Sequence, residues 1–318
     1  MLLPIILLII GLVILIAGAE YMVRSASSMA KKLGISSIVI GLTVVAFGTS
    51  APELVVNLIS SVKGTTDLAI GNIVGSNMAN ILLILGIGAV IKTLKVKEGT
   101  TFREIPFALL AIALVAIMGN DLFFEGSGAT VNAISRIDGI ILLCFFVIFM
   151  YYTYGISKVE GESEGVETYK WPAAIGMLLL GLAGLILGGK LIVDNAIIIA
   201  TMAGLSQALI GLTVVAVGTS LPELATTIVA IRKGHTDLAI GNAVGSNIFN
   251  VFLVLGVSAT IQPLPFNVDI NTDVLFTTAI TVLLFIFMFI DSKHNINRWQ
   301  GAMFILIYFT YISFAIFR

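Results

Sequence analysis

Long apolar runs recur along the whole chain, and their length restricts the fold more than any other feature. A bilayer core about 30 Å thick needs roughly 20 consecutive apolar residues from a helix. Ten runs meet or approach that length, at residues 3–23, 37–62, 68–92, 105–119, 134–154, 171–193, 206–231, 237–262, 272–290 and 298–317. Charged residues make up 11% of the chain, against about 25% in a typical soluble domain. The sequence therefore predicts an all-α membrane protein with ten transmembrane helices.

The chain also contains an internal repeat at an offset of 170 residues. Residues 40–86 and 210–256 are identical at 30 of 47 positions. We expect a first five-helix repeat at 1–155, an acidic cytoplasmic linker at 156–170 and a second five-helix repeat at 171–318. Because five is odd, the second repeat enters the membrane from the opposite side, so the two repeats are inverted. Inverted repeats with interrupted helices are typical of secondary transporters.

The basic residues predict the orientation. With the N-terminus outside, 13 of the 17 lysines and arginines fall on the inner side, as the positive-inside rule requires. We therefore expect a multi-pass protein of the cytoplasmic membrane with both termini outside. The net charge of −1 argues against a nucleic-acid partner, and the single Cys144 permits no intramolecular disulfide. The expected partners are the lipid bilayer and transported cations, and we expect the protein to act as a monomer.

Two matching motifs interrupt the second and seventh runs. They read FGTSAPELVVN at residues 47–57 and VGTSLPELATT at residues 217–227. Pro52 and Pro222 cannot donate a backbone hydrogen bond and clash with the preceding turn, so each motif should break its helix. The break is expected to leave the carbonyls of Ala46–Thr49, and the equivalent carbonyls of the second motif, without helical partners. We expect broken helices 2 and 7, together with 3 and 8, to meet at the midplane.

Each motif also places a carboxylate, Glu53 or Glu223, inside an apolar segment. A helix cap contributes about 1 kcal/mol, whereas an ionisable side chain at the bilayer centre costs roughly 2.5–3.5 kcal/mol. Capping therefore does not explain the glutamates, although Ser50 and Ser220 fit a capping box in part. Carboxylate, hydroxyl and carbonyl oxygens are the ligands that hard cations prefer. The motifs predict a cation or proton site.

Polar side chains follow on the next helix of each repeat. Asn72, Ser76 and Asn80 stand four residues apart on one helix face, and Asn242, Ser246 and Asn250 repeat the pattern. Small and amide residues also pack membrane helices against one another. Packing and ion ligation remain equally good explanations of Asn72, Asn77, Asn242 and Asn247. Ligation is the preferred interpretation of Ser76, Asn80, Ser246 and Asn250.

Two further pairs of oppositely charged residues are expected to form ion pairs near the membrane interface. Glu20 with Arg24, and Lys190 with Asp194, are four residues apart and have swapped signs at equivalent positions of the repeats.

The motifs GTSAPE…GNIVGSNMAN and GTSLPE…GNAVGSNIFN resemble the α-repeats of the sodium/calcium exchanger family, within the calcium/cation antiporter superfamily. The short linker resembles prokaryotic members, which lack a regulatory domain. The resemblance implies that Glu53 and Glu223 share a calcium ion. It implies one flanking sodium site formed by Ala46, Thr49 and Ser76. It implies a second flanking sodium site formed by Ala216, Thr219 and Ser246. Asn80 and Asn250 correspond to the family's central polar pair, and the hydroxyls of Ser50 and Ser220 are expected just outside the ligands.

The expected function is therefore secondary active exchange of Na⁺ for Ca²⁺ by alternating access, with no enzymatic activity and no cofactor. The resemblance implies that the first and sixth helices slide past the other eight. An H⁺/Ca²⁺ antiporter using the same two glutamates is the alternative. A cation channel is less favoured, because two pseudo-symmetric halves in one chain argue against a symmetric open pore.

Overall fold

The computed structural model describes residues 2–63, 66–124, 131–157, 167–202, 216–291 and 294–317. Within these ranges the chain is mostly helical. Seven helical segments are long and apolar enough to cross a membrane: Leu2–Leu33, Ala69–Ile91, Thr100–Met118, Arg136–Ser157, Trp171–Met202, Thr236–Ile261 and Ile270–Phe287. The bent pair Ser37–Thr49 and Ala51–Val62 is an eighth candidate. The predicted all-α membrane fold is confirmed at this level.

The elements of the first half follow the apolar runs. They are α1 (Leu2–Leu33), α2 (Ser37–Ile40), the π-helical η1 (Gly41–Val45), α3 (Ala46–Thr49), α4 (Ala51–Lys63), α5 (Thr66–Ala79), η2 (Asn80–Leu85), α6 (Gly86–Ile91), β1 (Leu94–Lys95), η3 (Thr100–Glu104), α7 (Ile105–Met118), α8 (Asp121–Phe124), β2 (Ala133–Ile134) and α9 (Arg136–Ser157).

The described elements of the second half follow a similar order. Its elements are α10 (Trp171–Met202), α12 (Ala216–Thr219), α13 (Leu221–Arg232), α14 (Thr236–Phe249), η6 (Asn250–Leu255), α15 (Gly256–Ile261), β3 (Leu264–Pro265), α16 (Val268–Phe287), β4 (Asn295–Ile296) and α17 (Arg298–Phe317). Most of the expected linker and the first part of the run 206–231 lie outside the described residues.

Element boundaries recur at the same offset as the sequence repeat. α14, η6 and α15 begin and end 170 positions after α5, η2 and α6, and β3 stands 170 positions after β1. Since identical boundaries arise from matching residues, the sequence repeat is also a repeat of local structure.

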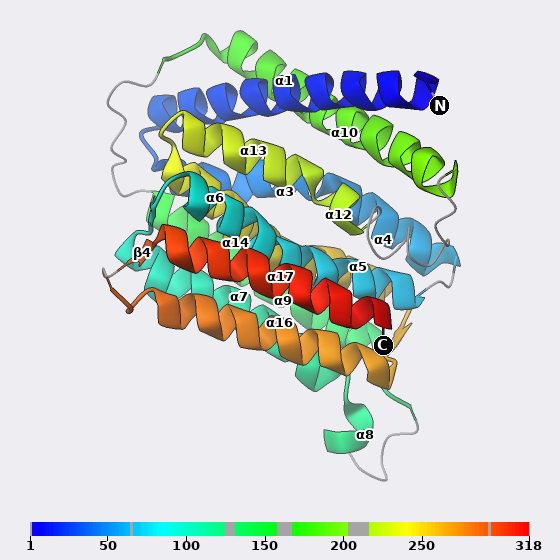
Figure 1. The fold of residues 1–318 in the computed structure, drawn as a ribbon. Coiled ribbons are helices and arrows are strands. Elements are labelled where there is room, and N and C mark those ends of the chain that lie inside the picture. The colour runs from blue at the N-terminus through cyan, green and yellow to red at the C-terminus, as the bar shows by residue number, and fades with distance from the viewer. Residues whose placement is uncertain are drawn as a thin grey trace.

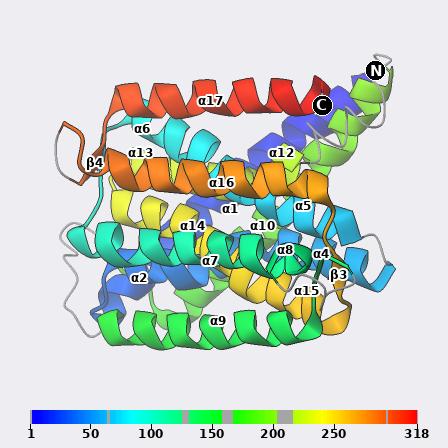
Figure 2. The same ribbon diagram turned by 90° about the horizontal axis from the view of Figure 1, so that it is seen from below.

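Short strands tie the two halves together. β1 pairs antiparallel with β4, and β2 pairs antiparallel with β3. Each pair thus joins a strand of one half to a strand of the other. Figure 2 shows β4 and β3 at opposite ends of the helix bundle.

The helices form layers (Figure 1). α1 and α10 lie side by side on one face, while α7, α9, α16 and α17 lie on the opposite face, which Figure 2 views directly. The segments Ala69–Ile91 and Thr236–Ile261 occupy the centre, since 78% of an apolar 18-residue stretch in each is buried, against 22% of such a stretch in α1, α9 and α10.

Glycines allow α1 and α10 to pack backbone against backbone. A Cβ atom on Gly18 would lie 2.7 Å from the amide nitrogen of Leu185, and one on Gly181 would lie 2.7 Å from that of Met22. Such close approach is how small residues stabilise helix pairs in a membrane, where burial alone gives no driving force. The two helices therefore form a tight pair that covers the broken helices.

Candidate functional site

The two predicted helix breaks lie at Ser50 and Ser220. Ser50 separates α3 from α4 with φ −83° and ψ 7°, and Ser220 separates α12 from α13 with φ −87° and ψ 5°. The first break bends the chain by 46°. Pro52 lies two residues after the first break, in the first turn of α4, where a missing N–H is tolerated. Both motifs therefore interrupt their helical segments, between α3 and α4 and between α12 and α13, as the sequence predicts.

Three expectations about local structure need correction. The segments expected as broken helices 3 and 8 are continuous spans, which change to π-helical turns at Asn80 and Asn250; they lack the proline that interrupts helices 2 and 7. The Ala46 carbonyl is not left without a partner, because it accepts the Ser50 amide at 3.0 Å. Ser220 makes no side-chain capping bond, since its hydroxyl instead contacts that of Ser76 at 2.8 Å.

The two glutamates are fully buried, with 0% exposure for Glu53 and 1% for Glu223. Oε1 of Glu53 accepts a hydrogen bond from Ser76 at 3.0 Å. Oε1 of Glu223 accepts one from Ser50 at 3.1 Å, with Ser246 at 3.5 Å. Among the ion pairs of the described residues, none involves either glutamate.

Four buried acceptor oxygens of this region have no hydrogen-bond partner in the described structure: Glu53 Oε2, Glu223 Oε2, Asn80 Oδ1 and Asn250 Oδ1. A buried polar atom without a partner costs about 1–3 kcal/mol. Two of these four oxygens belong to carboxylates, for which burial without a counter-charge costs more. Acceptor-only oxygens in such a group are what a bound cation satisfies.

The asparagines around the centre hold these amide oxygens in place. Asn80 donates through Nδ2 to Oδ1 of Asn247 at 2.9 Å, and Asn250 donates to Oδ1 of Asn77 at 3.1 Å. Asn77 and Asn247 in turn donate to each other's backbone carbonyls, at 3.2 and 3.4 Å. Because the Nδ2 groups are used in this exchange, the two central Oδ1 atoms are left as acceptors.

The flanking groups cross between the repeats, which corrects the expected grouping. Thr49 was expected beside Ser76, but its Oγ1 lies 3.5 Å from Oγ of Ser246 and donates to Oδ1 of Asn242 at 3.0 Å. Thr219 correspondingly donates to Asn72 at 3.4 Å, on the helix that carries Ser76. Each broken helix packs against the following helix of the other half, so hydroxyls from different repeats share a flank.

The carbonyl oxygen of Ala46 belongs to the first flank, since Thr49 Oγ1 lies 3.4 Å from it. Ala216 begins α12 at the equivalent place, but its side chain lies outside the described residues.

Two residues of this region, Asn57 and Thr227, were not singled out from the sequence. Both are buried with 0% exposure and follow their glutamates by four residues, on the same helix face. Asn57 accepts a hydrogen bond from Asn72 at 2.8 Å, and Thr227 accepts one from Asn242 at 3.2 Å. Their spacing from the glutamates was the signal that could have identified them.

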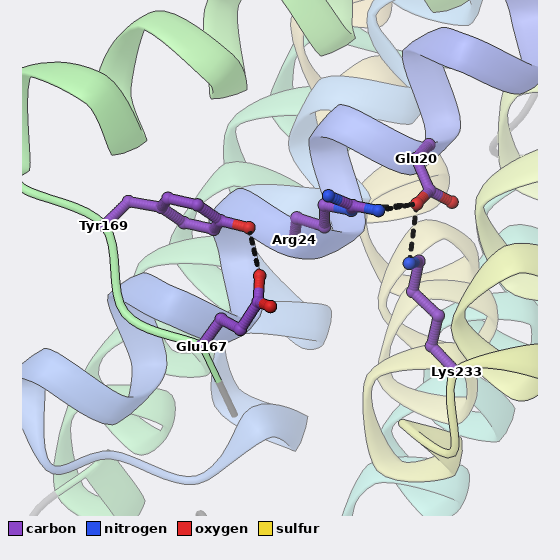
Figure 3. Close-up of polar contacts among 5 residues, drawn as sticks. All are labelled: Glu20, Arg24, Glu167, Tyr169 and Lys233. Atoms are coloured by element: carbon purple, nitrogen blue, oxygen red, sulfur yellow. Dashed lines mark hydrogen bonds and ion pairs between the residues drawn. The ribbon is translucent and has the colours of Figure 1, made fainter. Parts of the chain in front are cut away.

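A cluster of charges joins α1 to the end of α13 (Figure 3). Oε1 of Glu20 lies 2.7 Å from Nη2 of Arg24, as predicted, and 2.6 Å from Nζ of Lys233. Lys190 and Asp194, expected as the equivalent pair, form no ion pair among the described residues. The swapped-sign pairing therefore holds in the first half only.

A cavity of about 1170 Å³ lies beside this cluster, lined by residues that include Arg24, Lys233 and His235. Burial, with the nearby Lys233 charge, lowers the pKa of His235, so this imidazole is neutral at pH 7. The hydrogen bond to Glu167 raises the pKa of the Tyr169 hydroxyl, which donates to that carboxylate at 2.6 Å. None of the residues that line the cavity belongs to the two motifs.

Comparison with known proteins gives a consistent result. The family model described as "Sodium/calcium exchanger protein" matches residues 3–155 and 173–317. The chain is 38% identical to inner membrane protein YrbG of Escherichia coli, over 83% of this chain and 81% of that protein. It is 34% identical to sodium/calcium exchanger MaX1 of Methanosarcina acetivorans, over 88% and 89%. A solved structure of the sodium-calcium exchanger NCX_Mj, soaked with Na⁺ and Sr²⁺, superposes with a TM-score of 0.84 at 31% identity, covering 98% of each chain.

Proposed function

The chain belongs to the sodium/calcium exchanger protein family, and on this premise we propose that it exchanges Na⁺ for Ca²⁺ across a membrane by alternating access. As an exchanger it is a transporter rather than an enzyme, and its cargo is cations. The observation that carries the proposal is the group of four buried acceptor oxygens without partners, on Glu53, Glu223, Asn80 and Asn250.

Charge and ligand chemistry support calcium as one cargo. Two ionised glutamates carry −2, which balances one Ca²⁺ without a basic residue. Carboxylate and amide oxygens together match the mixed oxygen coordination that Ca²⁺ takes in proteins. When the calcium leaves, the same carboxylates have to be neutralised by other cations, so occupancy by the two cargoes is mutually exclusive. Exclusive occupancy couples the two fluxes.

The flanking oxygens support sodium as the counter-ion. Thr49, Ser246 and the Ala46 carbonyl approach one another on one flank, and Thr219 lies against the helix of Ser76 on the other. A proton needs only a carboxylate, whereas each Na⁺ needs several neutral oxygens in a fixed cage. An H⁺/Ca²⁺ antiporter would leave these hydroxyls without a role. We place Ala216 in the ligand set, at the position equivalent to Ala46. Four polar side chains lie beside the ligands: Ser50, Ser220, Asn72 and Asn242.

The architecture we propose has ten spans in two inverted repeats, residues 1–155 and 171–318, joined by a cytoplasmic linker at 156–170, with both termini outside the cytoplasmic membrane. The strand pairs at opposite ends of the bundle support inversion. Close packing of α1 against α10 supports the sliding of these two helices as one unit past the broken helices. The exchanger functions as a monomer, because each ion site draws on both halves of one chain.

Flux measurements in proteoliposomes test the choice of counter-ion. We expect an outward Na⁺ gradient to drive Ca²⁺ uptake, and this uptake to persist when a protonophore collapses any pH gradient. Ser76→Ala and Ser246→Ala should raise the Na⁺ requirement more than they weaken Ca²⁺ affinity. Uptake that a pH gradient drives in sodium-free buffer, and that ignores sodium, would instead establish the proton alternative. Saturable flux that requires a counter-ion separates a carrier from a channel.

A further inference from the structure

We infer that Asn57 and Thr227 orient the flanking threonines through a relay of side-chain amides. In each half, the residue one helical turn after the glutamate holds an asparagine amide of the next helix. That amide accepts the hydroxyl hydrogen of a threonine from the other half. Asn57 and Thr227 are thus positioning residues, and the inference rests on the proposed function in taking Na⁺ as the ion at the flanks.

The first relay starts from a backbone carbonyl. The carbonyl of Ala69 only accepts, so Asn57 must present its Nδ2 to it, at 3.0 Å. This fixes Oδ1 of Asn57 toward Asn72, which donates its Nδ2 at 2.8 Å. The Oδ1 atom of Asn72 is then the acceptor that faces Thr219, whose hydroxyl donates to it at 3.4 Å. The orientation of each group follows from the one before it.

The second relay reaches the same result with different residues. Asn242 donates through Nδ2 to the backbone carbonyl of Glu223 at 3.3 Å and to Oγ1 of Thr227 at 3.2 Å. Its Oδ1 therefore faces the other way and accepts the hydroxyl of Thr49 at 3.0 Å. Thr227 stands 170 positions after Asn57, so the two anchors occupy equivalent places in the repeats.

Orientation matters because a threonine hydroxyl has a single hydrogen and two lone pairs. A hydroxyl binds a cation through a lone pair, and its hydrogen must therefore point away from the ion. A buried carboxylate is a competing acceptor on the Thr49 flank, since Ser246 lies 3.5 Å from Oγ1 of Thr49 and 3.5 Å from Oε1 of Glu223. The amide oxygen gives the hydrogen an acceptor outside the ion site, so that the carboxylate and the hydroxyl oxygen can bind the same ion.

The two relays differ in how strongly the orientation of the asparagine depends on its anchor, which is Asn57 in the first relay and Thr227 in the second. Within the described residues, Asn72 donates its Nδ2 only to Asn57, and the loss of that acceptor frees the amide to rotate. Asn242 keeps the Glu223 carbonyl when Thr227 is removed. The structure therefore predicts that Asn57 is the more sensitive anchor.

A matched pair of variants in proteoliposomes tests the first relay. Valine and threonine have nearly the same shape, so Asn57→Val and Asn57→Thr change the packing alike, but only threonine keeps an acceptor for Asn72. We expect Asn57→Val to raise the Na⁺ concentration for half-maximal exchange about fivefold, as for the loss of one hydrogen bond. The Ca²⁺ concentration for half-maximal exchange should change less. Asn57→Thr should recover most of the loss, because Thr227 reaches Asn242 from the equivalent position.

Thr227→Val and Thr227→Ser form a second pair, which decides the matter if the Asn57 variants fail to fold. Here we expect a smaller rise in the Na⁺ requirement for Thr227→Val, with recovery in Thr227→Ser. Equal Na⁺ requirements within both pairs would overturn the inference. An unmodified protein whose Ca²⁺ uptake ignores Na⁺ would instead overturn the proposed function, so the two failures are distinguishable.

Discussion

At the scale of single residues, the site is explained by which atoms lack partners. Glu53 and Glu223 each satisfy one carboxylate oxygen with a serine hydroxyl and leave the other without a donor. Asn80 and Asn250 use their Nδ2 groups and leave their oxygens. A network built for stability would pair these atoms, because partly satisfied buried networks are costly. The unpaired oxygens are therefore the observation on which we base the proposal that these four residues are ligands.

Removing either glutamate charge should abolish calcium exchange. At an effective dielectric constant of 20, a unit charge about 4 Å away attracts a cation by about 4 kcal/mol for each positive charge on the cation. Glu53→Gln should therefore weaken Ca²⁺ binding at least a thousandfold. Glu223→Gln should do the same, because both carboxylates are needed to balance Ca²⁺. Radioactive calcium flux in reconstituted vesicles measures the loss.

Glu98→Gln is the matched control, since it removes one negative charge at an exposed position. Thermal unfolding of all three variants checks that they are folded. Near-normal exchange by Glu53→Gln would show that the glutamates do not share one ion.

The glutamates could be predicted from sequence because their cost in a membrane exceeds any capping gain, a comparison that needs no coordinates. The contact between Thr49 and Ser246 could not, because their hydroxyls come together only when helices 197 positions apart pack. The grouping of Thr49 with Ser76 came from the resemblance to the exchanger family. The offset of 170 residues shows which positions of the two repeats are equivalent, but it does not show which side chains are in contact.

At the scale of helices, the same limit applies to shape. Proline fixes where α3 ends and α4 begins, so the break was predictable. The π-helical turns that start at Asn80 and Asn250 were not, because no residue type demands them. These turns begin at the central asparagines themselves. The wider π-helical turns therefore occur at the candidate site. The α1–α10 pair was likewise hidden, because its glycines are scattered among other apolar residues.

The glycine contact between α1 and α10 should be sensitive to a single methyl group. A Cβ atom on Gly181 would lie 2.7 Å from the Met22 amide and 2.9 Å from the Gly18 carbonyl, both backbone atoms that cannot swing aside. Gly181→Ala should therefore destabilise the protein by about 1–3 kcal/mol. Gly176→Ala on the same helix has nothing within 4 Å and should be neutral or stabilising, because alanine favours helix by about 1 kcal/mol.

Thermal unfolding in detergent, followed by tryptophan fluorescence, compares the two variants. Equal melting temperatures would show that α1 and α10 are not held by backbone contact at this point.

At the scale of the whole molecule, the halves are interlocked rather than adjacent. Each strand pair and each flank of the proposed ion site draws on both repeats. The sequence repeat predicted two equivalent halves, and the charge count predicted how they are oriented, but neither indicated that the halves exchange partners. Interlocking brings groups of both halves together at the centre, where Asn77 and Asn247 donate to each other's backbone carbonyls.

Inversion makes a prediction about equivalent positions at the helix ends. Lys92 ends α6 and Gln262 ends α15, both are exposed, and they stand 170 positions apart. Inverted repeats place them on opposite sides of the membrane, with Lys92 on the cytoplasmic side, whereas parallel repeats place them on the same side. After Cys144 is replaced by serine, we expect a membrane-impermeant thiol reagent added outside intact cells to label Gln262→Cys and not Lys92→Cys. Inside-out vesicles should reverse the pattern, because the same reagent then meets the cytoplasmic face. Labelling of both cysteines from one side would rule out inversion.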